Sequence, residues 1–394
     1  MKSVENLYVA DVLDFFSLLT PAEQSALRRL RHLLDQDVKP VVNEYWESGE
    51  FPTQIIEPLV SAGLMNPVEV RDAGQEPSGL YAGFRNLELA RTDTSVATFY
   101  NAVSGLFRTT VLLGGSEEQV AQWDPQIQLF DFTGVFALTE PDHGSDIARG
   151  IAATAVRDGD QWVLNGSKRW IGGCSLVGNL AIFARGEKEG EVFAFIVPTE
   201  TPGITLTKIQ GKTSLRIMQN FDIDIVNVKV SEDRRLKNIN SFKDVAGLLR
   251  NMRSDVSWIA TGAQMGAYEA AVNYSMTRNQ FGKPIASFQL IQEKLATMLA
   301  NITASLSMVT RLTQQQDQGI YVDANSALAK RFCSARLRET AALAREIVGG
   351  NGILLEQDVA RFHADAEAVY SYEGTNEMNA LVVGRSITGI NAFK

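Results

Sequence analysis

The stretch GIAATAVRDGDQWVLNGSKRW, residues 150–170, is where the hydrophobic pattern of the chain changes its period. Apolar and polar residues alternate in two runs, and the turn-forming Asp158, Gly159 and Asp160 separate them, which predicts a β-hairpin. The runs LAIFARGEKEGEVFAFIV (180–197) and NFDIDIVNVKV (220–230) repeat the alternation, the second with a bulge at Ile225 and Val226. Residues 133–238 are therefore predicted to form a small antiparallel β-domain.

On both sides of this region the pattern is helical. Thr20, Pro21 and Glu23 form the capping-box signature that starts an amphipathic helix, and a second helix start follows at Ser116. In the last third, apolar residues spaced by three and four predict a long helix that ends near Gly319. The expected fold class is α+β, with an N-terminal helical domain (1–132), the β-domain (133–238) and a C-terminal four-helix-bundle domain (239–394).

Composition excludes several classes of protein. A net charge of −9 without a dense basic stretch argues against a nucleic-acid partner. Two cysteines and three histidines lie too far apart to indicate disulfides or a metal site. Acidic residues interrupt the N-terminal stretch MKSVENLYVADVLDFF, no run approaches the ~20 apolar residues of a membrane span, and the final NAFK is no peroxisomal signal. We expect a cytoplasmic protein.

Three motifs suggest chemistry, although each alone also has an ordinary structural interpretation. FALTEPDHGSD (136–146) presents backbone N–H groups and hydroxyls, but it could be a simple strand-to-loop exit. VGGNGIL (348–354) reads as a helix C-terminus followed by a turn. YSYEGTNEMNA (370–380) places Glu373 before a glycine, where a solvated surface turn is the alternative. Neither a GxGxxG nor a Walker A motif occurs.

The order of these motifs along an α-β-α chain resembles the acyl-CoA dehydrogenase superfamily from end to end, and most of all its branch of glutaryl-CoA dehydrogenases and short-chain acyl-CoA oxidases. The motifs are LTEPDHGSD (138–146), NGSKRWI (165–171), RNQFGKPIASFQLIQEKLA (278–296), GGNGI (349–353) and YEGTNE (372–377), with GKTSLR (211–216) supporting the branch. The resemblance implies an FAD-dependent enzyme that converts a short- or medium-chain acyl-CoA to the trans-2-enoyl-CoA.

The resemblance also implies how the chain holds FAD. The flavin edge would be lined by Phe136, Leu138, Thr139, Gly144 and Ser145, with Trp170 stacked nearby. The FAD of a neighbouring subunit would be held by Arg278, Phe281 and Gln289, with further contacts from Glu346 and Gly350. Thr375 and Glu377 would close over the cofactor. Sharing of FAD between subunits implies a homotetramer.

In this family, a residue at the position of Glu373 is the catalytic base that removes the α-proton while hydride passes to flavin N5. Such a carboxylate needs a dry environment that raises its pKa. The Glu373 backbone N–H would stabilise the enolate, and Gly374 would let the thioester approach. Ser145, Arg253 and Tyr372 are the remaining expected substrate contacts.

Two departures from the family pattern bear on substrate and acceptor. Ala97 stands where glutaryl-specific enzymes carry an arginine, so glutaryl-CoA is not the expected substrate. Gly172 replaces a threonine or serine whose hydroxyl lies near N5, as in plant short-chain acyl-CoA oxidases. An electron-transfer flavoprotein is the expected acceptor, with O₂ as the alternative and a non-catalytic acyl-thioester-binding flavoprotein as a third possibility. Chain length and the identity of the thiol stay open.

Overall fold

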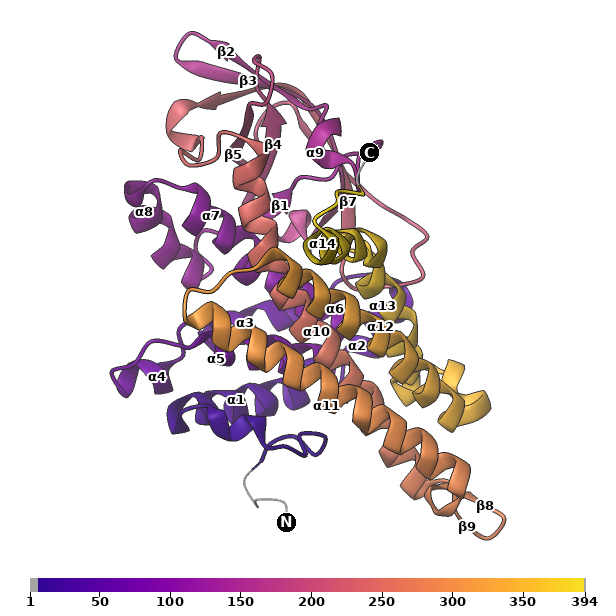
Figure 1. Ribbon diagram of the computed structural model, residues 1–394. Helices are drawn as coiled ribbons and strands as arrows, with labels where there is room; N and C mark the ends of the chain where they lie inside the picture. The colour runs from indigo at the N-terminus through magenta and orange to yellow at the C-terminus, as the bar shows by residue number, and fades with distance from the viewer. Residues whose placement is uncertain (1–5, 393–394) are drawn as a thin grey trace. The chain divides into compact units, whose positions relative to one another are not determined.

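The computed structural model describes residues 6–392, so the terminal MKSVE and the last two residues of NAFK lie outside the described part. Contacts divide the chain into two compact units: residues 6–98, 213–217 and 253–392 form the helical unit, and residues 99–212 and 218–252 form the sheet unit. Helices α6 and α10 run from one unit into the other (Figure 1). The predicted α+β organisation is confirmed, whereas the exact domain boundaries stay a prediction.

The elements of the helical unit are α1 Pro21–Leu33, α2 Val42–Ser48, α3 Ile56–Ser61, α4 Val68–Asp72, α5 Gly79–Thr92, α6 Thr94–Asn101, α10 Phe242–Thr277, β8 Asn279–Gln280, β9 Lys283–Pro284, α11 Gln289–Asp317, α12 Asp323–Val348, α13 Val359–Ser371 and α14 Asn376–Thr388. Those of the sheet unit are α7 Arg108–Gly114, α8 Glu117–Gln128, β1 Gly134–Ala137, α9 Ile147–Gly150, β2 Thr154–Asp158, β3 Gln161–Gly172, β4 Asn179–Arg185, β5 Val192–Pro198, β6 Ile204–Lys208 and β7 Asn220–Ser231.

The sheet is mostly antiparallel, as the alternating runs predict, but it is mixed. Its strand order is β1-β4-β2-β3-β7-β6, with β5 paired to β4. The β1–β4 ladder and the single β2–β4 pairing are parallel, which corrects the expectation of a wholly antiparallel sheet. Alternation within a strand reports which face is buried and carries no information about the direction of its neighbour, so the sequence pattern could not reveal this.

Local turn chemistry determines the hairpin that the sequence predicts. Strands β2 and β3 pair from Asp158 opposite Gln161, and Gly159 in the connection has φ +64°, a conformation that favours glycine. The bulge in β7 is also confirmed. The register shifts between Leu164 and Gly166, where β7 inserts an extra residue and Asn227 has φ +51°.

The core of the helical unit forms where α5, α10 and α11 pack around Trp258. A Cβ at Gly83 of α5 would lie 2.3 Å from the Trp258 ring, so the glycine makes room for the indole. The indole N–H donates to Thr313 Oγ1 of α11 at 2.9 Å, which satisfies the polar atom of this buried ring. At the start of α1, Thr20 and Glu23 form the predicted capping box.

A fully buried charge pair ties α13 to the start of α6. Arg361 contacts Asp93, and both side chains are essentially inaccessible to solvent. Arg361 also donates to Asp358 Oδ1 at 2.7 Å and to Asn43 Oδ1 at 2.7 Å, so its guanidinium serves three acceptors. Because a buried carboxylate is stable only while its cation is present, this pair holds α13 against the N-terminal helices.

We predict that Arg361→Leu lowers the free energy of unfolding by about 3–5 kcal/mol, since it leaves the Asp93 carboxylate buried without a cation. A urea titration followed by tryptophan fluorescence measures the change. Arg338→Leu is the matched control, because Arg338 pairs with Glu367 on the exposed surface. That variant should lose less than about 1 kcal/mol. Equal losses in the two variants would contradict the argument.

Candidate functional site

The turn between α13 and α14 presents Glu373 in a strained backbone conformation. Tyr372 ends α13, and Glu373 and Gly374 have φ values of +50° and +85°. Thr375 then caps α14 by accepting a hydrogen bond from the Met378 N–H at 3.2 Å. A glutamate in the left-handed region costs free energy, and such strain accumulates at functional sites. The sequence motif therefore forms a strained turn that carries the Glu373 carboxylate.

Lys330 of α12 stabilises this turn by hydrogen bonds to its backbone. Its side chain is fully buried, and Nζ donates to the carbonyl oxygens of Tyr370 at 2.9 Å and Gly374 at 2.8 Å, on either side of Glu373. Asn379 Nδ2 donates to the same Gly374 oxygen at 2.9 Å. Burial lowers the pKa of Lys330 to about 8, so the side chain is mainly protonated at neutral pH. The ammonium group fixes the position from which the Glu373 side chain projects.

The Glu373 carboxylate has no hydrogen-bond partner in the described part of the chain. Its Oε2 atom is fully enclosed and unpaired. Burial raises the pKa of the Glu373 carboxyl group to about 8, with a smaller contribution from the negative charge of Asp255, while Lys330 and Arg253 lower it. An unpaired, partly desolvated carboxylate is a stronger base than an ordinary glutamate, which is the property that removal of a weakly acidic proton requires.

Three ionisable groups lie near the Glu373 carboxylate, and the sequence motifs identified only one of them. Arg253, expected from the motif reading, lies close enough to interact with the charge of Glu373, and burial lowers its pKa. Lys330 and Asp255 were missed. Lys330 stands in an alanine-rich helix segment and Asp255 follows Arg253 by two residues, so a search for charged residues on predicted buried helix faces could have found both.

We predict that the rate of flavin reduction by substrate rises about tenfold per pH unit below pH 8 and levels off above it, because only ionised Glu373 accepts the proton. Stopped-flow absorbance from pH 6 to 10 measures this dependence. Asp255→Asn removes a negative charge that raises the pKa of Glu373, so it should move the rise to lower pH. A flat profile in the wild-type protein would contradict the assignment.

A second prediction concerns Lys330. Lys330→Met removes both a positive charge that lowers the pKa of Glu373 and the two bonds that hold its turn, so the rise should move above pH 8 and the limiting rate should fall at least tenfold. Lys330→Arg keeps the charge and should keep the midpoint near that of the wild type. A Met variant with an unchanged midpoint would show that Lys330 serves folding alone.

In the sheet unit, a buried ion pair shapes the loop after β1. Lys168 is inaccessible to solvent and donates to Glu140 Oε1 at 2.8 Å and to the Leu138 carbonyl at 3.1 Å. The other bonds of Glu140 come from the N–H groups of Ala152 and Ala153, at 2.7 and 3.0 Å. The loop that carries the predicted flavin-edge residues is therefore fixed at both of its ends.

This loop offers the donors that the edge of a flavin requires. Within the described chain, the N–H groups and hydroxyls of Thr139 and Ser145 and the N–H of Gly144 donate no hydrogen bond. Trp170, at the far end of β3, is 52% exposed and has φ +65°, an unusual combination for a large apolar ring. Free donors and an exposed indole fit a planar heterocycle such as the isoalloxazine of FAD. Phe136 and Leu138 lie in or directly after β1.

The five FAD contacts predicted for a neighbouring subunit lie away from the Glu373 turn. Arg278, Phe281, Gln289, Glu346 and Gly350 are all exposed, and Phe281 is 93% exposed with φ +52°. In Figure 1 the β8–β9 hairpin lies far from α14. Their exposure agrees with a role toward another subunit, which stays a prediction. Thr375 and Glu377, which are predicted to close over the cofactor, follow Glu373 in the chain. Thr375 caps α14, and Glu377 accepts a hydrogen bond from the Tyr370 hydroxyl at 3.2 Å.

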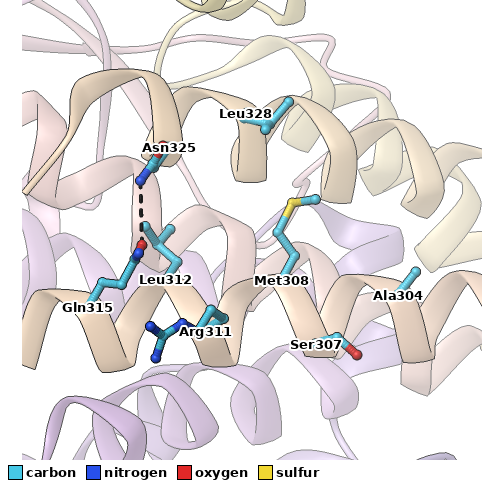
Figure 2. Close-up of a pocket in the computed structure, with 8 residues that line it drawn as sticks. All are labelled: Ala304, Ser307, Met308, Arg311, Leu312, Gln315, Asn325 and Leu328. Atoms are coloured by element: carbon cyan, nitrogen blue, oxygen red, sulfur yellow. Dashed lines mark hydrogen bonds between the residues drawn. The ribbon is translucent and has the colours of Figure 1, made fainter.

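A groove of about 410 Å³ lies between α11 and α12, away from these residues. Figure 2 shows Met308 and Leu312 along it and the hydrogen bond from Asn325 to Gln315 at one end. Its lining is mainly apolar and includes no residue of the Glu373 turn, so we assign it no catalytic role. In the described residues, no cluster of potential metal ligands occurs and no helix is long and apolar enough to cross a membrane.

Comparison with known proteins matches the chain along nearly its whole length. The N-terminal, middle and C-terminal domains of acyl-CoA dehydrogenase match residues 20–128, 135–228 and 242–388. A 3-(aryl)acrylate reductase of Clostridium sporogenes is 30% identical, covering 93% of this chain and 98% of that protein. A glutaryl-CoA dehydrogenase from Mycobacterium smegmatis in complex with FADH2 superimposes with TM-score 0.91 at 30% identity, over 98% of this chain and 100% of the other. Butyryl-CoA dehydrogenase from Megasphaera elsdenii gives 0.88 at 30% identity, over 94% and 98%.

Proposed function

The chain belongs to the acyl-CoA dehydrogenase family and is an FAD-dependent acyl-CoA dehydrogenase, and we propose that it desaturates short- or medium-chain acyl-CoA with Glu373 as the base. The observation that carries this proposal is the unpaired Glu373 carboxylate, whose Oε2 atom is enclosed, on a strained turn. A structural glutamate in that position would have a hydrogen-bond partner. The name of the butyryl-CoA relative supports the chain-length range.

The side chain and the backbone of the Glu373 turn have different roles in proton removal. Glu373 takes the α-proton of the thioester, and its own backbone N–H donates to no described group and so is free to bind the thioester oxygen. Gly374 leaves the approach to that N–H clear, because it carries no Cβ. Such a donor stabilises the negative charge that develops on the oxygen as the proton leaves. When bound, FAD supplies the oxidising power by accepting hydride from the β-carbon at N5.

The tail of the acyl chain is expected to lack a carboxylate. Ala97 is buried, with 1% of its surface exposed, and supplies no charge at the position where glutaryl-specific relatives have an arginine. Burying a tail carboxylate without a cation costs several kcal/mol. We therefore propose a monocarboxylic acyl group as substrate. Because one relative is named for an aryl-substituted substrate, 3-phenylpropanoyl-CoA belongs in the substrate panel.

An electron-transfer flavoprotein is the acceptor we propose. The alternative, O₂, rests on Gly172, whose missing side chain would leave space near the flavin. A Cβ at Gly172 would lie 2.5 Å from the Met218 methyl, so the methionine side chain already occupies that space. Packing against Met218 accounts for the glycine without an oxidase function. A homotetramer, implied by the exposed FAD contacts, is part of the same proposal.

We predict that Glu373→Gln keeps FAD but reduces the flavin at least 10³-fold more slowly with butyryl-, hexanoyl- or 3-phenylpropanoyl-CoA, because the amide cannot accept a proton. Anaerobic bleaching of the flavin band measures the rate. Glu367→Gln, an exposed change on α13, is the control and should keep the wild-type rate.

Three results would count against parts of the proposal. A colourless wild-type protein would favour a non-catalytic role, and fast bleaching in Glu373→Gln would place the base elsewhere. Efficient turnover of glutaryl-CoA would contradict the argument from Ala97. Admission of air to the bleached enzyme distinguishes the acceptors, since an oxidase would form peroxide at the rate of acyl-CoA consumption.

A further inference from the structure

A short chain of hydrogen bonds leads from α5 to α10 and ends on the half-buried carboxylate of Asp255, for which only an effect on the pKa of Glu373 has been described above. The Arg85 guanidinium donates to Asn86 Oδ1 at 3.3 Å, and Asn86 Nδ2 donates to Asp255 Oδ1 at 3.3 Å. Arg85 and Asn86 are 5% and 1% exposed. The arginine thereby fixes which way the amide points, and the amide can only donate to the carboxylate.

The second oxygen of Asp255 is left without a partner. Within residues 6–392, Asp255 Oδ2 accepts no hydrogen bond and forms no ion pair, and part of the residue stays accessible. Burial raises the pKa of Asp255 to about 6, and Arg85 lowers it, so the carboxylate is mainly ionised at neutral pH. Asp255 also lies near enough to Glu373 for their charges to repel. One acceptor therefore faces accessible space close to the base.

We propose that Asp255 Oδ2 accepts a hydrogen bond from a hydroxyl or amino group on the acyl chain, so that the preferred substrates are acyl thioesters carrying such a donor beyond the β-carbon. This inference rests on the proposed function, because the α-carbon must lie beside the Glu373 carboxylate for the rest of the acyl chain to pass Asp255. It names a substrate class that neither the family match nor the mechanism requires.

The energetics of burial favour this class of tail. An acyl tail that lies against Asp255 displaces water from its unpaired oxygen, and the resulting desolvation cost would be removed by a hydroxyl or ammonium group on the ligand. An alkyl tail in the same place offers no hydrogen-bond donor, so the desolvation cost of the Asp255 oxygen would remain. A carboxylate tail would meet a like charge with no cation at Ala97, so the same aspartate disfavours dicarboxylic substrates.

A purely electrostatic role for Asp255 is the competing explanation, since its charge raises the pKa of Glu373. That role changes the reactivity of the base toward every substrate by the same factor. Recognition of a donor changes the ratio between a substituted and an unsubstituted substrate of equal length. The ratio of limiting kcat/KM values at high pH, where Glu373 is ionised, therefore separates the two roles.

The test compares 6-hydroxyhexanoyl- and 6-aminohexanoyl-CoA with hexanoyl-CoA, and the corresponding C8 compounds with octanoyl-CoA, using the FAD-loaded enzyme. The wild type should prefer a substituted substrate at one of the two lengths. Asp255→Leu should lower that preference about 10- to 100-fold. Asp255→Asn should retain part of the preference for the hydroxyl, because its amide oxygen still accepts, and lose that for the ammonium. Asp37→Leu, an exposed change, should leave every ratio unaltered.

Binding is measured separately with the Glu373→Gln holoenzyme, in which the same ligands perturb the flavin spectrum without turnover. Tighter binding of a substituted acyl-CoA that Asp255→Leu abolishes supports the inference even if Glu373 is not the base. Absence of bleaching in the wild type would overturn only the proposed function. Equal losses for substituted and unsubstituted ligands, or a wild-type preference for the alkyl tail at both lengths, would overturn the role of Asp255.

Discussion

The contact between the Lys330 ammonium and two backbone carbonyls is the interaction on which the functional turn depends. A glutamate with φ +50° followed by a glycine with φ +85° is not a conformation that the local chain adopts by preference. Donation from Lys330 to the carbonyls of Tyr370 and Gly374 stabilises that conformation from a different helix. Since Lys330 lies on α12 and the turn joins α13 to α14, packing of these helices is a condition for placing the Glu373 carboxylate.

The same lysine limits how far the environment can raise the pKa of Glu373. Burial and Asp255 favour the protonated form, while Lys330 and Arg253 favour the ionised form. The balance near pH 8 leaves a carboxylate that is basic enough to remove an α-proton and still ionises under mild conditions. Without the cations, the group would stay protonated and inert. Without the burial, it would be a weak base at its ordinary pKa.

The sequence predicted those parts of the fold and site that depend on local chemistry. The capping box at Thr20, the turn at Gly159 and the bulge in β7 each follow from a few neighbouring residues and were confirmed. Segments far apart in the chain are joined by the parallel β1–β4 ladder and by the interactions of Lys330 and Asp255. No local sequence pattern predicted these contacts. Glu373 was identified through the order of family motifs, which encodes non-local structure indirectly.

Asp255 shows why the difference between local and non-local information matters for substrate specificity. Motifs shared across a family report the features that its members have in common, and these need not include the residues that contact the tail of the acyl chain. The proposed contact with the acyl tail depends instead on residues of α5 and α10, whose partners are known only once these helices are packed. A carboxylate next to a base also changes the pKa of that base, so a residue that selects the tail affects the chemistry as well. The proposed selection of substrate and the pKa of Glu373 therefore depend on the same aspartate.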